Sequence, residues 1–114
     1  IEKITIEKES IMGGMSCGEV SLVPWQILNK SVHFCVTVSD DYISKTVKKL
    51  ANKEFSDEKI VGGECSTPGI TSLVGLSNDR DIRKKINLNE SSNVLLFGCE
   101  GDADEELYKK LLSE

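Results

Sequence analysis

The sequence predicts an α/β fold in which a three-layer, mostly parallel sheet is flanked by helices. Three short apolar runs, 33–38, 59–62 and 93–98, have the composition of buried strands. A turn and then a helical pattern follow each run, which is the order of βαβ units. Because the chain has 114 residues, we expect residues 1–114 to form a single α/β unit.

The first third of the chain is expected to contain a strand, a loop and a helix. Residues 1–7 alternate apolar and polar side chains, the pattern of a strand with one face in water. Glycines among small residues make 10–20 a loop. Ser21 can cap a helix that extends through Val32, and Pro24 stands in its first turn, where a missing N–H costs least.

Four further helices are expected from capping residues and from apolar side chains at helical spacing. One follows Ser39-Asp40-Asp41, one extends over 66–77, one extends over 79–86, and the last follows Asp102 or Asp104. The 66–77 helix opens at Ser66 or Thr67, with Pro68 in its first turn.

Composition excludes several classes of protein and of ligand. The net charge of −5 makes nucleic acid an unexpected partner, and no apolar run approaches the ~20 residues that span a bilayer. The four cysteines form no CxxC pair, and there is one histidine, so a metal site has little support. Reduced thiols and a cytoplasmic location are expected, although counting alone leaves two disulfides open.

Three turns are candidates for a binding site, because ligands of parallel sheets bind at the carboxyl ends of strands. They are 39–41, 62–67 and 98–102. Glycines in the second and third turns would let the backbone approach a ligand closely, and a helix N-terminus attracts negative charge. Each turn is also explained by tight-turn geometry with a helix cap alone. Cys65 and Cys99 could be nucleophiles, but neither has a visible basic partner.

Three stretches, taken in order, resemble one enzyme family. Residues 12–20 read Met-Gly-Gly-Met-Ser-Cys-Gly-Glu-Val, against Met-Ala-Gly-Leu-x-Cys-Gly-Glu-Pro in the family, and Trp25 and Leu28 follow on the helix. Residues 62–67 read Gly-Gly-Glu-Cys-Ser-Thr, against Ser-Gly-Glu-Ser-Gly-Ala. Residues 99–104 read Cys-Glu-Gly-Asp-Ala-Asp, against Thr-Glu-Gly-Asp-Thr-Asp.

These stretches resemble the C-terminal part of the diaminopropionate ammonia-lyase family, whose members are fold type II, tryptophan-synthase-β-like enzymes that use pyridoxal 5′-phosphate. The resemblance implies elimination of ammonia from 2,3-diaminopropionate, a small amino-acid substrate, to give pyruvate. It also implies a homodimer for the complete enzyme. The family's Schiff-base lysine and glycine-rich phosphate loop lie earlier in its sequence, and neither motif is found here. We therefore expect a C-terminal portion of the cofactor domain, inactive alone, consistent with a start at Ile1 rather than Met.

The resemblance also implies cofactor-binding residues and no catalytic or metal-binding ones. Cys99 matches a neutral residue that faces the pyridine nitrogen in related enzymes, and Glu64, with Gly63 beside it, lines the cofactor pocket. Cys17 and Gly18 are expected to line the same cavity.

Among the departures from the family pattern, Val20 replaces Pro, Cys65 and Thr67 replace Ser and Ala, and Cys99 replaces Thr. A cysteine keeps an uncharged group at the ring nitrogen, whereas the changes in the 62–67 turn alter that edge of the pocket.

Two other functions remain open on the sequence. The chain could be a free-standing α/β binding or interaction module without catalysis, or a cysteine-based enzyme that uses Cys65 or Cys99. A partial cofactor domain would expose apolar surface and be less stable than its length suggests, or associate.

Overall fold

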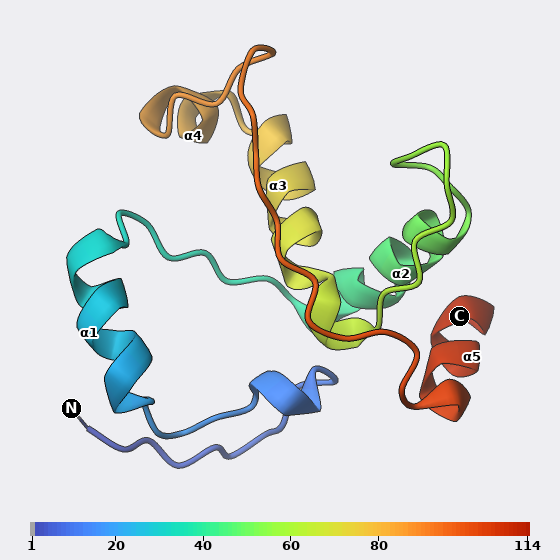
Figure 1. Cartoon of the computed structure of the whole chain (residues 1–114), viewed down its shortest axis with the longest axis horizontal. Coiled ribbons are helices and arrows are strands. Elements are labelled where there is room, and N and C mark those ends of the chain that lie inside the picture. Colours follow the sequence, from blue (N-terminus) through green and yellow to red (C-terminus); the bar gives the residue numbers. More distant parts are fainter. Residues whose placement is uncertain (1) are drawn as a thin grey trace.

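The computed structural model describes residues 2–114, and helices are the only regular structure in that range (Figure 1). The α-helices are α1 Leu22–Ser31, α2 Ile43–Ala51, α3 Pro68–Asn78, α4 Arg80–Lys85 and α5 Glu105–Ser113. Three single turns of 3₁₀-helix accompany them: η1 Gly13–Met15, η2 Asp40–Tyr42 and η3 Glu64–Ser66.

All five expected helices are confirmed. Two of the expected caps are present, Ser39 on the η2 turn before α2 and Asp104 on α5, and Asp79 also caps α4. The side chains of Ser39, Asp79 and Asp104 each accept a hydrogen bond from a backbone amide in the following turn, at 3.3, 2.9 and 2.9 Å. Such caps satisfy N–H groups that have no partner inside the helix. The elements that depend on neighbours in sequence therefore form where the sequence places them.

Two expected caps are wrong. Ser21 precedes α1 without a side-chain hydrogen bond to it, and Thr67 precedes α3 in the same way. The Thr67 hydroxyl instead donates to the Glu64 carbonyl at 2.9 Å, and the Ser66 hydroxyl bonds to the main chain of Glu100. Both side chains hold the turn before α3 rather than the helix itself.

The expected parallel sheet is wrong, because residues 2–114 contain no strand. The runs 33–38, 59–62 and 93–98 are free of helix but pair with no second strand, and the same holds for 2–7; Ile1 lies outside the described residues. A ladder needs a neighbouring strand about 4.8 Å away. The apolar, β-branched pattern indicates that a segment can form a strand. It does not indicate whether a second strand lies beside that segment.

The 93–98 segment lies along α3, as Figure 1 shows, instead of beside another strand. Leu96 approaches Gly69 at the start of α3 so closely that a Cβ on this glycine would lie 3.4 Å from the Leu96 side chain. The segment is thus packed on one side by a helix, while Leu95 and Phe97 are about four-fifths exposed.

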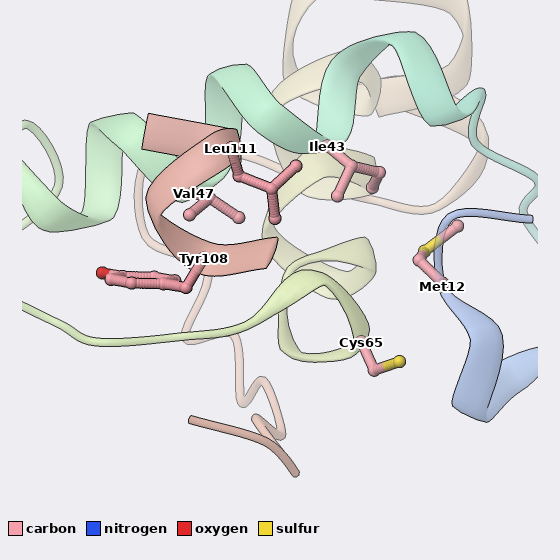
Figure 2. Packing of buried hydrophobic residues seen from close by; sticks show 6 residues of the cluster. All are labelled: Met12, Ile43, Val47, Cys65, Tyr108 and Leu111. Atoms are coloured by element: carbon pink, nitrogen blue, oxygen red, sulfur yellow. The ribbon is translucent and has the colours of Figure 1, made fainter. Parts of the chain in front are cut away.

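A small core forms where α2 meets α5 and the turns before α2 and α3 (Figure 2). Ile43 and Val47 of α2 and Leu111 of α5 are fully buried. Their neighbours in the cluster are Met12, Cys65 and Tyr108. Helix α2 forms because its apolar side chains share one face, which this core buries.

A buried pair of hydroxyl groups joins α2 to α3. Thr46 donates to the Tyr42 carbonyl at 3.0 Å and lies 2.9 Å from the Thr71 hydroxyl, which also lies 2.8 Å from the Thr67 carbonyl. Both buried hydroxyls therefore have partners, so burying them carries no large penalty. In contrast, the buried Tyr108 hydroxyl has no partner among the described residues.

The chain is expanded for its length. Its radius of gyration is 15.5 Å, against about 13 Å for a compact domain of this size. Large apolar side chains of α1 and of the 34–36 and 94–97 segments are exposed. Among residues 2–114 there is no helix of the length and apolarity needed to cross a bilayer.

Replacing Leu111 by alanine tests the small core. We expect Leu111→Ala to lower the free energy of unfolding by about 2–5 kcal/mol, because it leaves a cavity between α2 and α5. Leu95→Ala removes the same atoms at a position that is 78% exposed, so its effect should stay within about 0.5 kcal/mol. Urea unfolding followed by circular dichroism measures both, and equal midpoint shifts would contradict the assigned core.

Candidate functional site

The 62–67 and 98–102 turns meet at one junction, built around Glu100. The first turn contains η3 and leads directly into α3, and the second follows the extended 93–98 segment. The two turns are more than thirty residues apart in sequence. The junction therefore brings two of the three expected turns together without a sheet.

The main chain of Glu100 is held on both sides. Its N–H donates to the Ser66 hydroxyl at 2.6 Å, and its carbonyl accepts from that hydroxyl and from the Gly63 N–H, the latter at 3.2 Å. Its carboxylate accepts from the Cys65 N–H at 3.1 Å. Bonds to an ionised acceptor are stronger than neutral ones. Glu100 thus fixes the turn before α3 through its backbone and its side chain at once.

Close packing explains the glycine at position 63. Its φ is −71°, a value that any residue adopts. A Cβ on Gly63 would collide with the Gly101 carbonyl and would lie 3.0 Å from a carboxylate oxygen of Glu100. The glycine is therefore required by the approach of the 99–101 backbone and not by its own conformation.

The two cysteines of the junction differ in exposure. Cys99 is exposed, and its thiol lies 3.6 Å from the Cys65 carbonyl, within hydrogen-bonding distance for sulfur. The Cys65 side chain is buried, and a Cβ on Gly14 would lie 3.3 Å from its sulfur. Burial raises the pKa of the Cys65 thiol above its ordinary value, and the Glu100 carboxylate beside it raises the pKa further. A neutral, enclosed thiol is a poor nucleophile.

A second set of contacts holds the 10–16 loop against η2, at the 39–41 turn. The Asp40 carboxylate accepts from the Ser10 hydroxyl at 2.6 Å and from the Ile11 N–H at 2.9 Å. These two bonds lower the pKa of the Asp40 carboxyl below its ordinary value. Held in this way, the loop places Gly14 against Cys65 and inserts Met12 into the core.

The structure places the five expected site residues in two groups. Gly63, Glu64 and Cys99 belong to the Glu100 junction. Cys17 and Gly18 follow η1 and lie next to the N-terminal segment: Gly18 accepts from the Ile4 N–H at 2.9 Å, and a Cβ on Gly18 would collide with the Ile4 carbonyl. No described contact joins Cys17 or Gly18 to the junction.

Three potential metal ligands also gather at the junction. One ligand atom each of Glu64, Cys65 and Glu100 lies within 4.8 Å of the others. The Glu100 carboxylate already accepts a hydrogen bond from the Cys65 amide, and burial together with this carboxylate raises the pKa of the Cys65 thiol. The hydrogen bonds of the junction therefore explain why these three residues lie close together.

Sequence reasoning missed the roles of Glu100, Ser66 and Asp40. Glu100 and Asp40 stand in turns that the sequence marked, but their partners are about thirty residues away, at Ser66, Ser10 and Ile11. An acidic residue two positions after the end of an apolar run is the local signal, and it does not identify the partner.

Comparison with known proteins finds one kind of relative. No protein-family model matches the chain. The chain is 26% identical over 113 residues to a diaminopropionate ammonia-lyase of Salmonella typhimurium. This match covers 96% of the chain and 28% of the relative. It is 27% identical over 108 residues to the enzyme of the same name from Escherichia coli K12. This second match covers 92% of the chain and 27% of the relative. The chain thus spans little more than a quarter of the length of the curated relatives it matches.

Adding a methyl group at position 63 tests the junction. Gly63→Ala should lower the free energy of unfolding by about 1–3 kcal/mol, because the methyl group forces the 99–101 backbone away. Gly13→Ala is the matched control, since its Cβ would meet nothing within 4 Å. Chemical denaturation compares the two variants, and a Gly63→Ala protein as stable as the control would contradict the packing.

Thiol labelling tests the difference between the cysteines. With iodoacetamide at neutral pH we expect Cys99 to react readily and Cys65 to react several-fold more slowly than it does in the urea-unfolded chain, because of its burial and raised pKa. Peptide mapping by mass spectrometry gives the rate at each site. Enhanced labelling of Cys65 in the native chain would instead favour a cysteine nucleophile.

Proposed function

We propose that this chain is the C-terminal part of the cofactor domain of a pyridoxal-phosphate-dependent ammonia-lyase that acts on 2,3-diaminopropionate. The Glu100 junction carries the proposal, because two stretches that resemble the lyase family fold against each other there. Similarity to two diaminopropionate ammonia-lyases over at least 92% of the chain supports it independently.

The junction residues fit one side of the cofactor. Cys99 presents an exposed thiol whose contact with the protein is a long bond to the Cys65 carbonyl, and the absence of a side chain at Gly63 keeps the turn close to the 99–101 backbone. Cysteine thiols are mostly uncharged at neutral pH. We assign Cys99 to the pyridine nitrogen, and Gly63 and Glu64 to the wall beside it. Cys17 and Gly18 are assigned to a more distant part of the same wall.

The chain's own residues have a limited task in this proposal. When bound, pyridoxal phosphate supplies the electron sink for elimination. Cys99 would hydrogen-bond to the ring nitrogen, where a carboxylate would instead favour the protonated ring, and the Glu100 bonds fix the position of this wall. The residue that binds the cofactor covalently and the loop that holds its phosphate are assigned to the rest of the enzyme. The chain alone is therefore inactive, and the complete enzyme is proposed to be a cytoplasmic homodimer that converts its substrate into pyruvate and ammonia.

The two alternatives have less support. A free-standing binding module should cover its apolar side chains, whereas Leu22, Phe34 and Phe97 are each more than three-fifths exposed. A cysteine enzyme would use Cys65 or Cys99, and the raised pKa of Cys65 disfavours the first of these.

Cofactor titration tests the proposal. We expect the chain alone to give no visible absorbance of bound pyridoxal phosphate. Added to the part of the Escherichia coli relative that it does not match, it should restore both cofactor absorbance and pyruvate formation from 2,3-diaminopropionate. Cofactor attached covalently to a lysine of the chain alone would contradict the proposal, as would a mixture in which cofactor binding is not restored.

A further inference from the structure

The chain exposes far more surface than a compact protein of its mass. Its accessible area is 9007 Å² for 12.6 kDa, whereas a folded monomer of that mass exposes about 6,200 Å². The excess is roughly 2,800 Å² on this chain alone, which is more than the ~800 Å² that each partner contributes to a standard protein–protein interface. Many large apolar side chains contribute to this surface, so it is suited to burial against a partner.

One part of that surface is hollowed into an apolar groove. A cavity of about 560 Å³ lies between the extended 36–39 segment, α2 and α3, in the region of Figure 1 where these elements meet. Its apolar lining consists of Val36, Val38, Phe55, Val74, Leu76 and Ile82. Val36 is 49% and Val74 39% exposed. Both side chains are therefore accessible to a partner.

The polar groups of the groove specify the kind of partner. Thr46 and Thr71 line it with hydroxyls that already bond to each other at 2.9 Å, so these two need no partner from outside. Lys45 and Lys49 bring ammonium groups 6.0 Å from the Tyr42 ring and 5.8 Å from the Phe55 ring. Lys49 pairs with Glu54 at 3.5 Å, whereas Lys45 forms no ion pair within residues 2–114. A fitting occupant is apolar and carries a carboxylate next to its apolar residues.

The backbone next to the groove is also without partners. No described hydrogen bond uses the amides of 33–38, and Phe34 in this run is 62% exposed. The edge of the groove along 36–38 therefore offers a partner both apolar side chains and main-chain N–H groups.

We infer that this groove, which we call the α2–α3 groove, is the docking surface for an apolar, acid-flanked segment from the remaining part of a diaminopropionate ammonia-lyase polypeptide. The inference rests on the proposed function. The length of the relatives favours this occupant, because nearly three quarters of each lies outside the part that the chain matches. The excess exposed area is large enough for such an interface, and Lys45, which forms no ion pair within residues 2–114, favours a carboxylate on the partner.

Binding between the chain and the unmatched part of the Escherichia coli relative tests the inference. Sedimentation velocity and calorimetry should detect a one-to-one complex with the unaltered chain. Val74→Asp should weaken the complex at least tenfold, because it puts a carboxylate into the groove. Lys45→Glu should weaken it several-fold, and more strongly at low salt. Val23→Asp is the matched control, since Val23 is 73% exposed on α1 and does not line the groove; its binding should change less than twofold. Urea midpoints confirm that each variant folds as the unaltered chain does.

The outcomes separate this inference from the proposed function. If Val74→Asp and Val23→Asp weaken the complex equally, or not at all, the α2–α3 groove is not the docking surface. The proposed function is then unaffected. A complex that depends on Val74 but binds no cofactor supports the groove and overturns the proposed function. Absence of a complex overturns both. Self-association of the chain that Val74→Asp abolishes would make a second copy the occupant, which also overturns the inference.

Discussion

The hydrogen bonds of Glu100 hold together two parts of the chain that are far apart in sequence. They join the end of the 93–98 segment to the turn that starts α3, two stretches more than thirty residues apart. Through that turn they fix Cys65, whose side chain reaches the core beside Met12 and α2. Because Ser66 and Gly63 bind the Glu100 main chain while Cys65 binds its carboxylate, one residue holds three neighbours in a single arrangement.

The structure combines this fixed junction with unusually open surroundings. Asp40 ties the 10–16 loop to η2, and the Thr46–Thr71 pair ties α2 to α3. Beyond these contacts, α1 and the extended segments leave their apolar side chains in water. Such exposure costs free energy that a self-contained domain would recover by burial. The junction and the exposed surface have one explanation if the chain is a wall of a larger enzyme, with a partner on the α2–α3 groove.

Local signals in the sequence were sufficient for the helices and insufficient for their assembly. Asp79 and Asp104 cap the helices they precede, because a cap and its amide are two or three residues apart. The run 93–98 suits a strand, yet it lies on α3 with no second strand beside it. The three site residues Gly63, Glu64 and Cys99 were expected at neighbouring turns and lie at one junction, although the sheet that would have brought them together is absent from residues 2–114. The role of Glu100 in the junction could not be predicted from the sequence, because its partner Ser66 is 34 residues away.

Hydrogen exchange of the chain alone tests whether the Glu100 junction is the fixed part of the structure. We expect protected amides at Gly63, Cys65 and Ser66 and along the buried side of α2, because each of these has a hydrogen-bond partner. We expect exchange close to that of an unfolded chain for 33–38 and 93–98, whose amides have no described partner. Protection of those two segments equal to that of α2, with unprotected amides at the Glu100 junction, would contradict both expectations.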